Sequence, residues 1–299
     1  MLFPDPNIGK PREKVGYFPS RRHFDRFAAT YTDAMAQLPE PDHTTSVTTS
    51  FGPVRAYRFG AGAGTPLVLL SGRQASTPMW RNNLPGLMVD RPVWSLDSVG
   101  EPGASSQQRP LTGPDDQVQW IVETLQGLGL RQVHLLGVSI GGWLAVQVAV
   151  RRPEWLVATT LLDPANTFAP LSWKMIAVSL GSAVPGLPMS IRHRLLGWIS
   201  GGAGSSETTP EGRLISSAMR DFTIAQPVPH RPTLAELEGV RVPVLALIAG
   251  GSIVHDARRA AENAQRIPQA HVEVWPRASH AINGEYPDDI ARRIAEFAH

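Results

Sequence analysis

Short runs of consecutive apolar residues recur along the chain and predict strands that are buried on both faces of a sheet. These runs lie at residues 66–70, 93–96, 133–136, 156–162, 242–248 and 272–275. Amphipathic helical patterns separate most of them, notably at residues 117–128 and 257–266, and a last one covers residues 288–297. This alternation predicts an α/β fold in which a mostly parallel sheet is covered by helices on both faces.

The N-terminal part of the chain has a different pattern. Residues 22–38 place aromatic and aliphatic side chains at steps of three and four, which predicts an amphipathic helix packed on the outside of the domain. Residues 46–51 and 54–59 alternate between apolar and polar side chains on either side of Gly52-Pro53, and they predict a β-hairpin.

One long interval interrupts the alternation. Between the strands predicted at 156–162 and 242–248, apolar residues are broken by prolines and by a Gly/Ser-rich run at residues 201–206, and no convincing strand is found. We expect a helical lid with a flexible hinge or tip over the carboxyl edge of the sheet, where open α/β sheets bind ligands. The predicted organisation is an N-terminal extension with one helix (1–43), a core in two parts (44–166 and 239–299) and a helical lid (167–238) inserted between them.

Composition narrows the class of protein. A chain of 299 residues with 42% hydrophobic residues can bury a full core, and the absence of Cys excludes disulfides, Cys-based metal sites and thiol catalysis. A net charge of +2 without a long basic run gives no case for nucleic acid. A Pro and an acid near the start argue against a signal peptide, and no apolar stretch is long enough to span a membrane. We expect a soluble, cytoplasmic protein; the sequence does not determine its oligomeric state.

The strand at 133–136 leads into Gly137-Val138-Ser139-Ile140-Gly141, and a helical pattern follows at once at residues 143–150. A strand that turns directly into a helix needs small residues two places on either side of the turning residue, which is itself strained. The Ser139 hydroxyl would then project from the carboxyl end of a strand, at the positive end of a helix dipole. In this context the pattern predicts a nucleophile.

These motifs resemble those of the α/β-hydrolase superfamily over residues 46–299, and most closely those of small lidded bacterial carboxylesterases. The matching residues are the elbow at 137–142, Ser71-Gly72 after the third strand, the turn at 97–100 and Ser279-His280 near the end. The resemblance implies an α/β-hydrolase fold with an inserted helical lid. It also implies catalytic residues in the chain order Ser, acid, His.

The Ser139 hydroxyl needs a general base within hydrogen-bond reach, because it is a poor nucleophile at neutral pH. The resemblance places the catalytic histidine at His280. Among the nine His residues, His280 alone follows the last predicted strand, in a loop that returns to the carboxyl edge of the sheet.

The acid departs from the family's pattern, because the family usually places it after the seventh strand, where this chain has Ser252. Asp163 is our preferred acid: it ends the sixth strand in Leu-Asp-Pro-Ala, a context that resembles the vertebrate pancreatic lipases. Asp256 is the alternative, although it occupies the position of a helix N-cap, where Asp is common for structural reasons. A site without a working acid is the third possibility. Asp97 we expect to order the loop near the elbow rather than to act in catalysis.

An oxyanion hole needs two backbone N–H groups directed at the developing charge. Ile140 would supply one, and Arg73 or Gln74, after Gly72, the other. For substrate binding, Trp80 either lines the acyl pocket or packs in the core, the latter being favoured. Trp173 and Trp198 of the lid are further candidates.

The sequence therefore predicts a serine hydrolase that forms an acyl-enzyme on Ser139 and cleaves small apolar carboxylic esters or lactones, without a metal or an organic cofactor. Ser139 argues against dehalogenases and epoxide hydrolases of this fold, which use an Asp nucleophile. A thioesterase, an acyltransferase, a cofactor-free haloperoxidase or a C–C hydrolase would use the same residues. A non-catalytic ligand-binding homologue is the alternative from another class, and Ser252 in the usual acid position is its only support.

Overall fold

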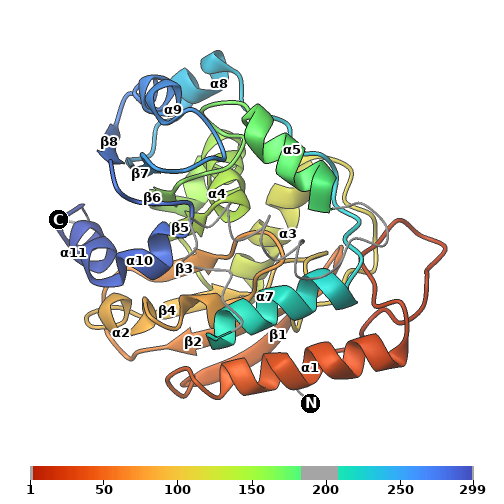
Figure 1. Cartoon of the computed structure of the whole chain (residues 1–299). Coiled ribbons are helices and arrows are strands. Elements are labelled where there is room, and N and C mark those ends of the chain that lie inside the picture. The colour runs from red at the N-terminus through yellow and green to blue at the C-terminus, as the bar shows by residue number, and fades with distance from the viewer. Residues whose placement is uncertain (1–2, 183–207, 298–299) are drawn as a thin grey trace.

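A computed structural model of the chain describes residues 3–182 and 208–297. The described part is built around one twisted sheet of eight strands, with helices on both faces (Figure 1). The strands are β1 (His43–Thr49), β2 (Gly52–Phe59), β3 (Leu67–Leu70), β4 (Val93–Leu96), β5 (Val133–Val138), β6 (Leu156–Leu162), β7 (Val244–Ala249) and β8 (Ala270–Trp275). Every apolar run of the sequence thus forms a strand, and the predicted hairpin is β1–β2.

The strand order is β1-β2-β4-β3-β5-β6-β7-β8. β2 pairs antiparallel with both β1 and β4, whereas all pairs from β4 to β8 are parallel. The carboxyl ends of β3 to β8 therefore meet at one edge of the sheet, and the residues that follow these strands are brought together. The predicted α/β-hydrolase fold is confirmed.

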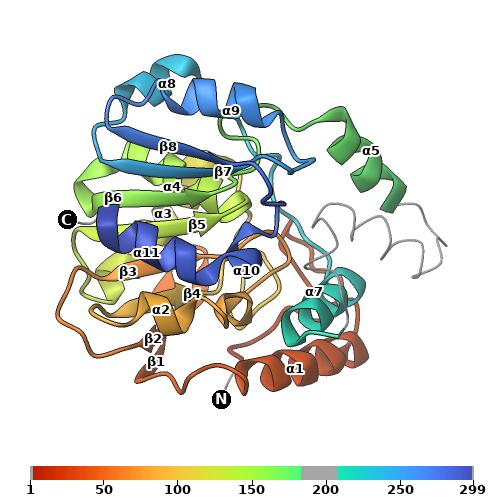
Figure 2. The same cartoon turned by 60° about the vertical axis from the view of Figure 1, so that its left-hand side comes forward.

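Helices form two layers. The layer on one face of the sheet consists of α3 (Pro114–Gly127), α4 (Ile140–Arg151), α8 (Leu234–Gly239) and α9 (Ala257–Ala264), and their apolar sides share one hydrophobic core with the sheet. The other face is covered by α2 (Leu84–Leu87) and α11 (Pro287–Phe297), together with the 3₁₀ helix η1 (Thr77–Trp80) and the short α10 (Ile282–Glu285). A second 3₁₀ helix, η2 (Pro153–Trp155), links α4 to β6. Figure 2 shows α10, α11 and α2 on the near side of the sheet.

The predicted N-terminal helix is α1 (Arg21–Met35), and it packs mainly against α7 (Pro210–Asp221) (Figures 1 and 2). It also meets the sheet where Tyr31 is hydrogen-bonded to Tyr57 of β2. The buried carboxylate of Asp221 accepts hydrogen bonds from Arg26 of α1 and from Arg220. Tyr17 and Thr223 pair through two backbone hydrogen bonds, of 2.8 and 3.0 Å, just outside the two helices. The N-terminal extension therefore fixes the position of α7.

The described part of the predicted lid contains helices joined by irregular segments. α5 (Trp173–Ser182) and α7 belong to it, whereas residues 183–207, which include Trp198 and the Gly/Ser-rich run, lie outside the described residues. α8, at the predicted end of the lid, packs on α4 and contributes the buried Leu237 to the core. Within residues 3–182 and 208–297, none of the helices combines the length and the apolar character needed to cross a lipid bilayer.

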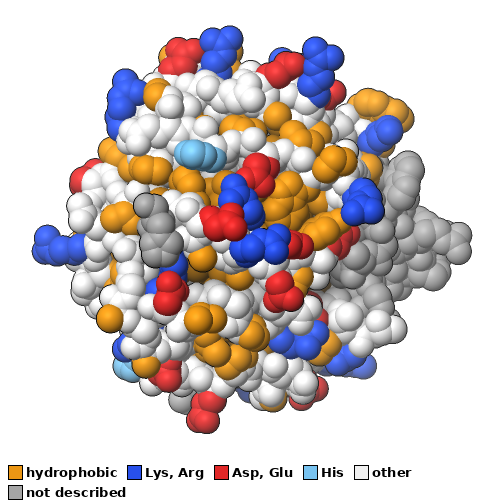
Figure 3. Space-filling model, turned by 90° about the vertical axis from the view of Figure 1, so that its left-hand side faces the viewer, with side chains coloured by type: hydrophobic (Ala, Val, Ile, Leu, Met, Phe, Trp, Pro, Cys, Tyr) orange, Lys and Arg blue, Asp and Glu red, His pale blue; other side chains and the backbone are white. Residues whose placement is uncertain are grey.

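The surface near the edge strand β8 and helix α11 is mixed in charge. Over the described residues of the face in Figure 3, positive and negative side chains are interspersed with apolar ones. Glu273 on the edge strand β8, for example, pairs with Arg293 of α11, which also pairs with Glu296. This face offers no continuous basic surface of the kind that binds a phosphate backbone.

Candidate active site

Ser139 stands at the sharp turn between β5 and α4, with φ of 55° and ψ of −118°. This is a conformation that residues other than glycine rarely adopt, and strain of this kind is typical of functional sites. The two flanking glycines make the turn possible. A Cβ atom added at Gly137 would lie 2.2 Å from the Gly141 carbonyl oxygen, and one added at Gly141 would lie 2.0 Å from that of Leu70. The local structure is the one that the Gly-x-Ser-x-Gly pattern predicts.

His280 and Asp163 complete a hydrogen-bonded series with Ser139. The Oγ atom of Ser139 lies 2.9 Å from Nε2 of His280, and Nδ1 of His280 lies 2.6 Å from Oδ2 of Asp163. Because an ionised carboxylate can only accept, the proton of the imidazole belongs on Nδ1, which leaves Nε2 free to accept from the serine hydroxyl. We call these three residues the candidate triad.

Asp163 is the first residue after β6 and is completely buried, with φ of 42°. Its backbone N–H donates to Leu247 of β7 at 2.8 Å, and its Oδ1 atom accepts the backbone N–H of Ala249 at 3.1 Å. Oδ1 also lies 3.0 Å from Nε2 of His255. Burial alone would raise the pKa of Asp163, but its interactions with His255 and His280 outweigh burial and hold the pKa well below the ordinary value. Asp163 is therefore a carboxylate at neutral pH.

The other carboxylates considered from the sequence have structural partners. Asp256 is exposed, and it caps α9 by accepting the backbone N–H of Arg259 at 2.8 Å. Asp97 is buried after β4 and accepts hydrogen bonds from Tyr31, from the backbone N–H of Ala104, and from both the backbone and the hydroxyl of Thr77. The geometry thus brings Asp163, and neither Asp256 nor Asp97, to His280.

The loop after β3 lies beside the candidate nucleophile. A Cβ atom added at Gly72 would be 3.6 Å from the Cβ of Ser139. Two candidate oxyanion donors follow in this loop, Arg73 and Gln74. The backbone N–H of Gln74 is already hydrogen-bonded, because it donates to Oε2 of Glu101 at 2.9 Å. The N–H of Arg73, with that of Ile140 at the start of α4, remains available within the described residues. We therefore withdraw Gln74 as a donor.

Glu101 holds this loop in two ways. Besides accepting from the Gln74 backbone, it accepts a hydrogen bond from Nη1 of Arg73 at 3.0 Å. The carboxyl is fully buried, and burial raises its pKa, although Arg73 and the Gln74 N–H act in the opposite direction. Sequence analysis missed Glu101, because nothing in its local pattern indicates that a residue after β4 reaches the loop after β3.

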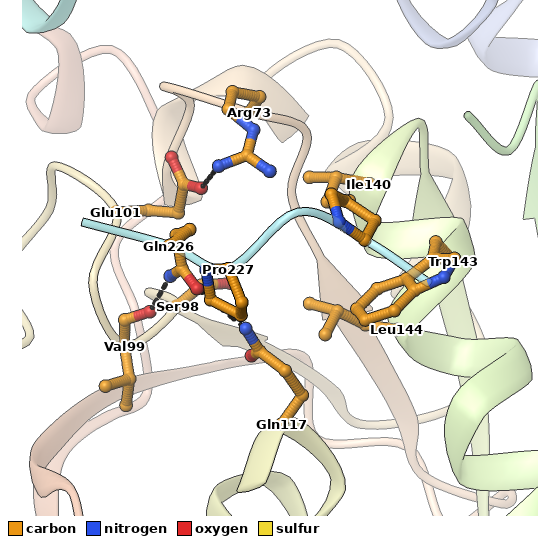
Figure 4. A pocket seen from close by; sticks show the side chains of 11 residues that line it. Arg73, Ser98, Val99, Glu101, Gln117, Ile140, Trp143, Leu144, Gln226 and Pro227 are labelled. Carbon is orange, nitrogen blue, oxygen red and sulfur yellow. Dashed lines mark hydrogen bonds and ion pairs between the residues drawn. The ribbon is translucent and has the colours of Figure 1, made fainter. Parts of the chain in front are cut away.

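A small pocket of about 10 Å³ lies beside Ile140, the residue after Ser139 (Figure 4). Ile140, Trp143 and Leu144 of α4 form an apolar side. Across from them lie the Arg73–Glu101 pair and the side chain of Gln226, which is hydrogen-bonded to the Val99 carbonyl. The lining is therefore partly polar, and the charge of Arg73 is matched by Glu101.

Of the three candidate tryptophans, two do not line this pocket and the third lies outside the described residues. Trp80 is completely buried in the core on the other face of the sheet, with its indole N–H donating to Ser71 Oγ at 3.1 Å. It therefore packs in the core, the alternative that the sequence favours, and the prediction that it binds substrate in this pocket is corrected. Trp173, at the start of α5, is 74% exposed and is not among the pocket residues. Trp198 lies outside the described residues.

His255 is a second residue near the site that sequence analysis did not select. It lies in the loop between β7 and α9, and its side chain is completely buried against Asp163. Only its position between two predicted elements was visible in the sequence. Within the described residues, no group of three or more His, Asp or Glu side chains has an arrangement that would hold a metal ion.

A comparison with protein families matches residues 67–293 to the model of the alpha/beta hydrolase family. Two proteins of Bacillus subtilis (strain 168) are similar over nearly the whole chain. One is named uncharacterized carboxylesterase nap, with 24% identity over 91% of this chain and 92% of the relative. The other is named carboxylesterase YbfK, with 24% identity over 91% of this chain and 93% of the relative.

Solved structures agree with this likeness. The crystal structure of naproxen esterase (carboxylesterase NP) from Bacillus subtilis has a TM-score of 0.84 and 23% identity, and the match covers 93% of this chain and 98% of that one. Carboxylesterase CesB (YbfK) from the same organism gives a TM-score of 0.83 and 22% identity, covering 92% and 98%. The resemblance to small bacterial carboxylesterases that the sequence indicates is thus confirmed.

Proposed function

Because the chain belongs to the alpha/beta hydrolase family, we propose that it is a carboxylic ester hydrolase that forms an acyl-enzyme on Ser139. His280 is the general base and Asp163 the acid that orients it. The observation that carries the proposal is the hydrogen-bonded series from Ser139 Oγ through His280 to Asp163, at 2.9 and 2.6 Å, at the carboxyl edge of the sheet. The carboxylesterase names of the Bacillus relatives support an ester as the bond that is cleaved.

In the first half of the reaction, Ser139 Oγ attacks the ester carbonyl while its proton passes to His280 Nε2. The charge that develops on the carbonyl oxygen is stabilised by the N–H groups of Ile140 and Arg73. The tetrahedral intermediate then collapses as His280 returns the proton to the leaving alcohol. Asp163 holds Nδ1 and stabilises the imidazolium that forms.

In the second half, water takes the place of the alcohol. His280 removes a proton from the water as it attacks the acyl-enzyme, and the same two backbone N–H groups stabilise the new oxyanion. Collapse of this intermediate breaks the bond to Ser139 Oγ, which recovers its proton from His280, and the carboxylic acid leaves. No group beyond these residues is required to balance the protons.

We propose apolar esters or lactones as substrates. The apolar side chains of Ile140, Trp143 and Leu144, which follow the nucleophile in α4, support this class. Among the described residues around them the cation is Arg73, which is paired with Glu101, so an anionic substrate group would gain little there.

The test is hydrolysis of p-nitrophenyl esters from acetate to decanoate by the wild type and by Ser139→Ala. We expect turnover by the wild type and its loss, by about 10⁴-fold or more, in the variant. Ser50→Ala is the matched control, because Ser50 is an exposed serine in the β1–β2 turn, and it should retain full activity. Undiminished activity of Ser139→Ala, or a wild type that hydrolyses none of these esters, would contradict the proposal.

A further inference from the structure

We propose that His255 is a positioning residue that holds the carboxylate of Asp163 in the orientation required by His280. This inference rests on the proposed function, because it assigns a role within the same site. It goes beyond that function in giving the loop between β7 and α9 a part in the reaction, although this loop supplies neither the nucleophile, the base nor the acid.

The contact is made deep inside the protein. Nε2 of His255 lies 3.0 Å from Oδ1 of Asp163, and both side chains are completely buried. The other carboxylate oxygen, Oδ2, is the one that faces His280 at 2.6 Å. The two histidines therefore approach the carboxylate from its two oxygens, and any rotation of the group would disturb both contacts.

The position of the proton on His255 follows from its surroundings. Within residues 3–182 and 208–297, neither ring nitrogen of His255 has a hydrogen-bond partner, but Nε2 lies 3.0 Å from a carboxylate oxygen of Asp163. A proton on Nδ1 would be buried without an acceptor, whereas a proton on Nε2 lies beside the negative charge of Asp163. The neutral tautomer with its proton on Nε2 is therefore the form that fits, and electrostatic attraction to this N–H holds the carboxylate in place.

The loop that carries His255 is itself anchored. Ser172, which precedes α5, donates two hydrogen bonds to this loop. Its backbone N–H donates to the Val254 carbonyl at 2.8 Å, and its hydroxyl donates to the Ile253 carbonyl. On the other side of His255, Asp256 fixes the start of α9. The imidazole is therefore delivered to Asp163 by backbone that is tied down on both sides.

Asp163 needs such support because of its own backbone conformation. With φ of 42° at the end of β6, its side chain leaves the strand in an unusual direction, and only the Ala249 N–H otherwise binds Oδ1. Without His255 the carboxylate would lose the imidazole N–H that lies beside Oδ1 and would rotate away from His280. Since electrostatic contacts between buried groups are stronger than those in water, we expect kcat to fall about 10- to 100-fold with KM little changed.

Two substitutions of His255 separate positioning from packing. His255→Gln keeps an amide N–H near the place of Nε2, whereas His255→Phe keeps the volume of the side chain and removes the donor. We expect kcat of the Gln variant to stay within about threefold of the wild type and that of the Phe variant to fall about 10- to 100-fold. Arg258→Ala, at a strongly exposed position of α9, is the control and should leave kcat unchanged. Equal losses in the Gln and Phe variants would overturn the proposal.

A double-mutant cycle keeps the test decisive if His255→Phe is less stable. We would measure the rate at which a fluorophosphonate probe labels the active-site serine in the wild type, Asp163→Asn, His255→Phe and the double variant, at a temperature where all are folded. If His255 acts through Asp163, adding His255→Phe to Asp163→Asn should change the rate less than twofold. Multiplicative losses would overturn the positioning role and leave the proposed function intact. Labelling that persists in Ser139→Ala would instead contradict the proposed function.

Discussion

Oδ2 of Asp163 lies 2.6 Å from Nδ1 of His280, although Asp163 follows β6, His280 follows β8, and β7 lies between these strands in the sheet. The loop after β8 reaches Asp163 by crossing the end of β7, where the chain has Gly250 and Gly251. These glycines bind the crossing loop through backbone N–H groups that donate to the carbonyls of Trp275 and Ala278, each at 2.9 Å. The Gly-Gly pair therefore lets the histidine reach an acid that is two strands away.

The crossing predicts the effect of a small side chain at Gly250. A Cβ atom added there would lie 2.8 Å from the Cα atom of Pro276, which is backbone and cannot easily move. Gly250→Ala should therefore shift the loop that carries His280, lowering kcat at least 10-fold and the free energy of unfolding by about 1–3 kcal/mol. Urea denaturation and ester hydrolysis measure the two effects. Gly239→Ala, where an added Cβ meets nothing within 4 Å, should change neither.

The identity of the acid is tested by exchanging carboxylates for amides. Asp163→Asn should lower kcat by about 10³- to 10⁴-fold while the fold is retained, because an amide cannot hold the imidazole in the productive tautomer. Asp256→Asn should lower the free energy of unfolding by at most about 1 kcal/mol, the contribution of a helix N-cap, and should keep full activity. The reverse ranking of the two variants in steady-state kinetics would contradict the assignment of Asp163.

The low pKa of Asp163 has a consequence for stability. Because the pKa is lower in the folded protein than the ordinary value of 3.8, folding favours the charged form, and the resulting stabilisation is complete above about pH 4. It is lost as the pH falls below the unfolded value toward the folded one. The wild type should therefore lose stability relative to Asp163→Asn, measured as the free energy of unfolding, when the pH is lowered from 4 to 3. Urea denaturation at pH 7, 5, 4 and 3 checks this, and a difference that is independent of pH would contradict it.

Glu101 is expected to matter through the loop that it holds. The two donors use different oxygens of Glu101, since Arg73 Nη1 donates to Oε1 and the Gln74 N–H to Oε2. In Glu101→Gln one of these oxygens is replaced by an NH2 group, which is itself a donor and cannot accept the hydrogen bond. We expect the Arg73 N–H to move from its place near Ser139 and kcat to fall about 10-fold, a fraction of the loss from removing an oxyanion donor. Glu123→Gln is the matched control. Glu123 likewise accepts from both a backbone N–H and a side chain, of Ser50, but does so at the β1–β2 turn.

Much of the fold follows from patterns that are local in the sequence. Continuous apolar runs become strands because a sheet covered on both faces buries every side chain, as in β3, where all four residues are completely buried. The turn at Ser139 is equally local, since Gly137 and Gly141 are required within a few residues of it. Chain order and the Leu-Asp-Pro-Ala context were enough to select His280 and Asp163 as candidates.

The residues that sequence analysis missed depend on contacts between distant segments. Glu101 reaches the loop after β3 only because β3 and β4 are neighbours in the sheet, and His255 meets Asp163 only because β6 and β7 are. For Trp80 the sequence favours the core over the pocket. Its burial is completed by helices from the distant C-terminal part of the chain, which contribute Ile282, Ile290 and Ile294.

The most direct test of the account is to label the protein with a fluorophosphonate probe and to identify the modified peptide by mass spectrometry. We predict one modified residue, Ser139, with labelling that is abolished in Ser139→Ala and slowed by orders of magnitude in His280→Ala, in parallel with ester hydrolysis. A wild-type protein that hydrolyses esters while Ser139 remains unmodified, or labelling at another serine that tracks activity, would contradict it.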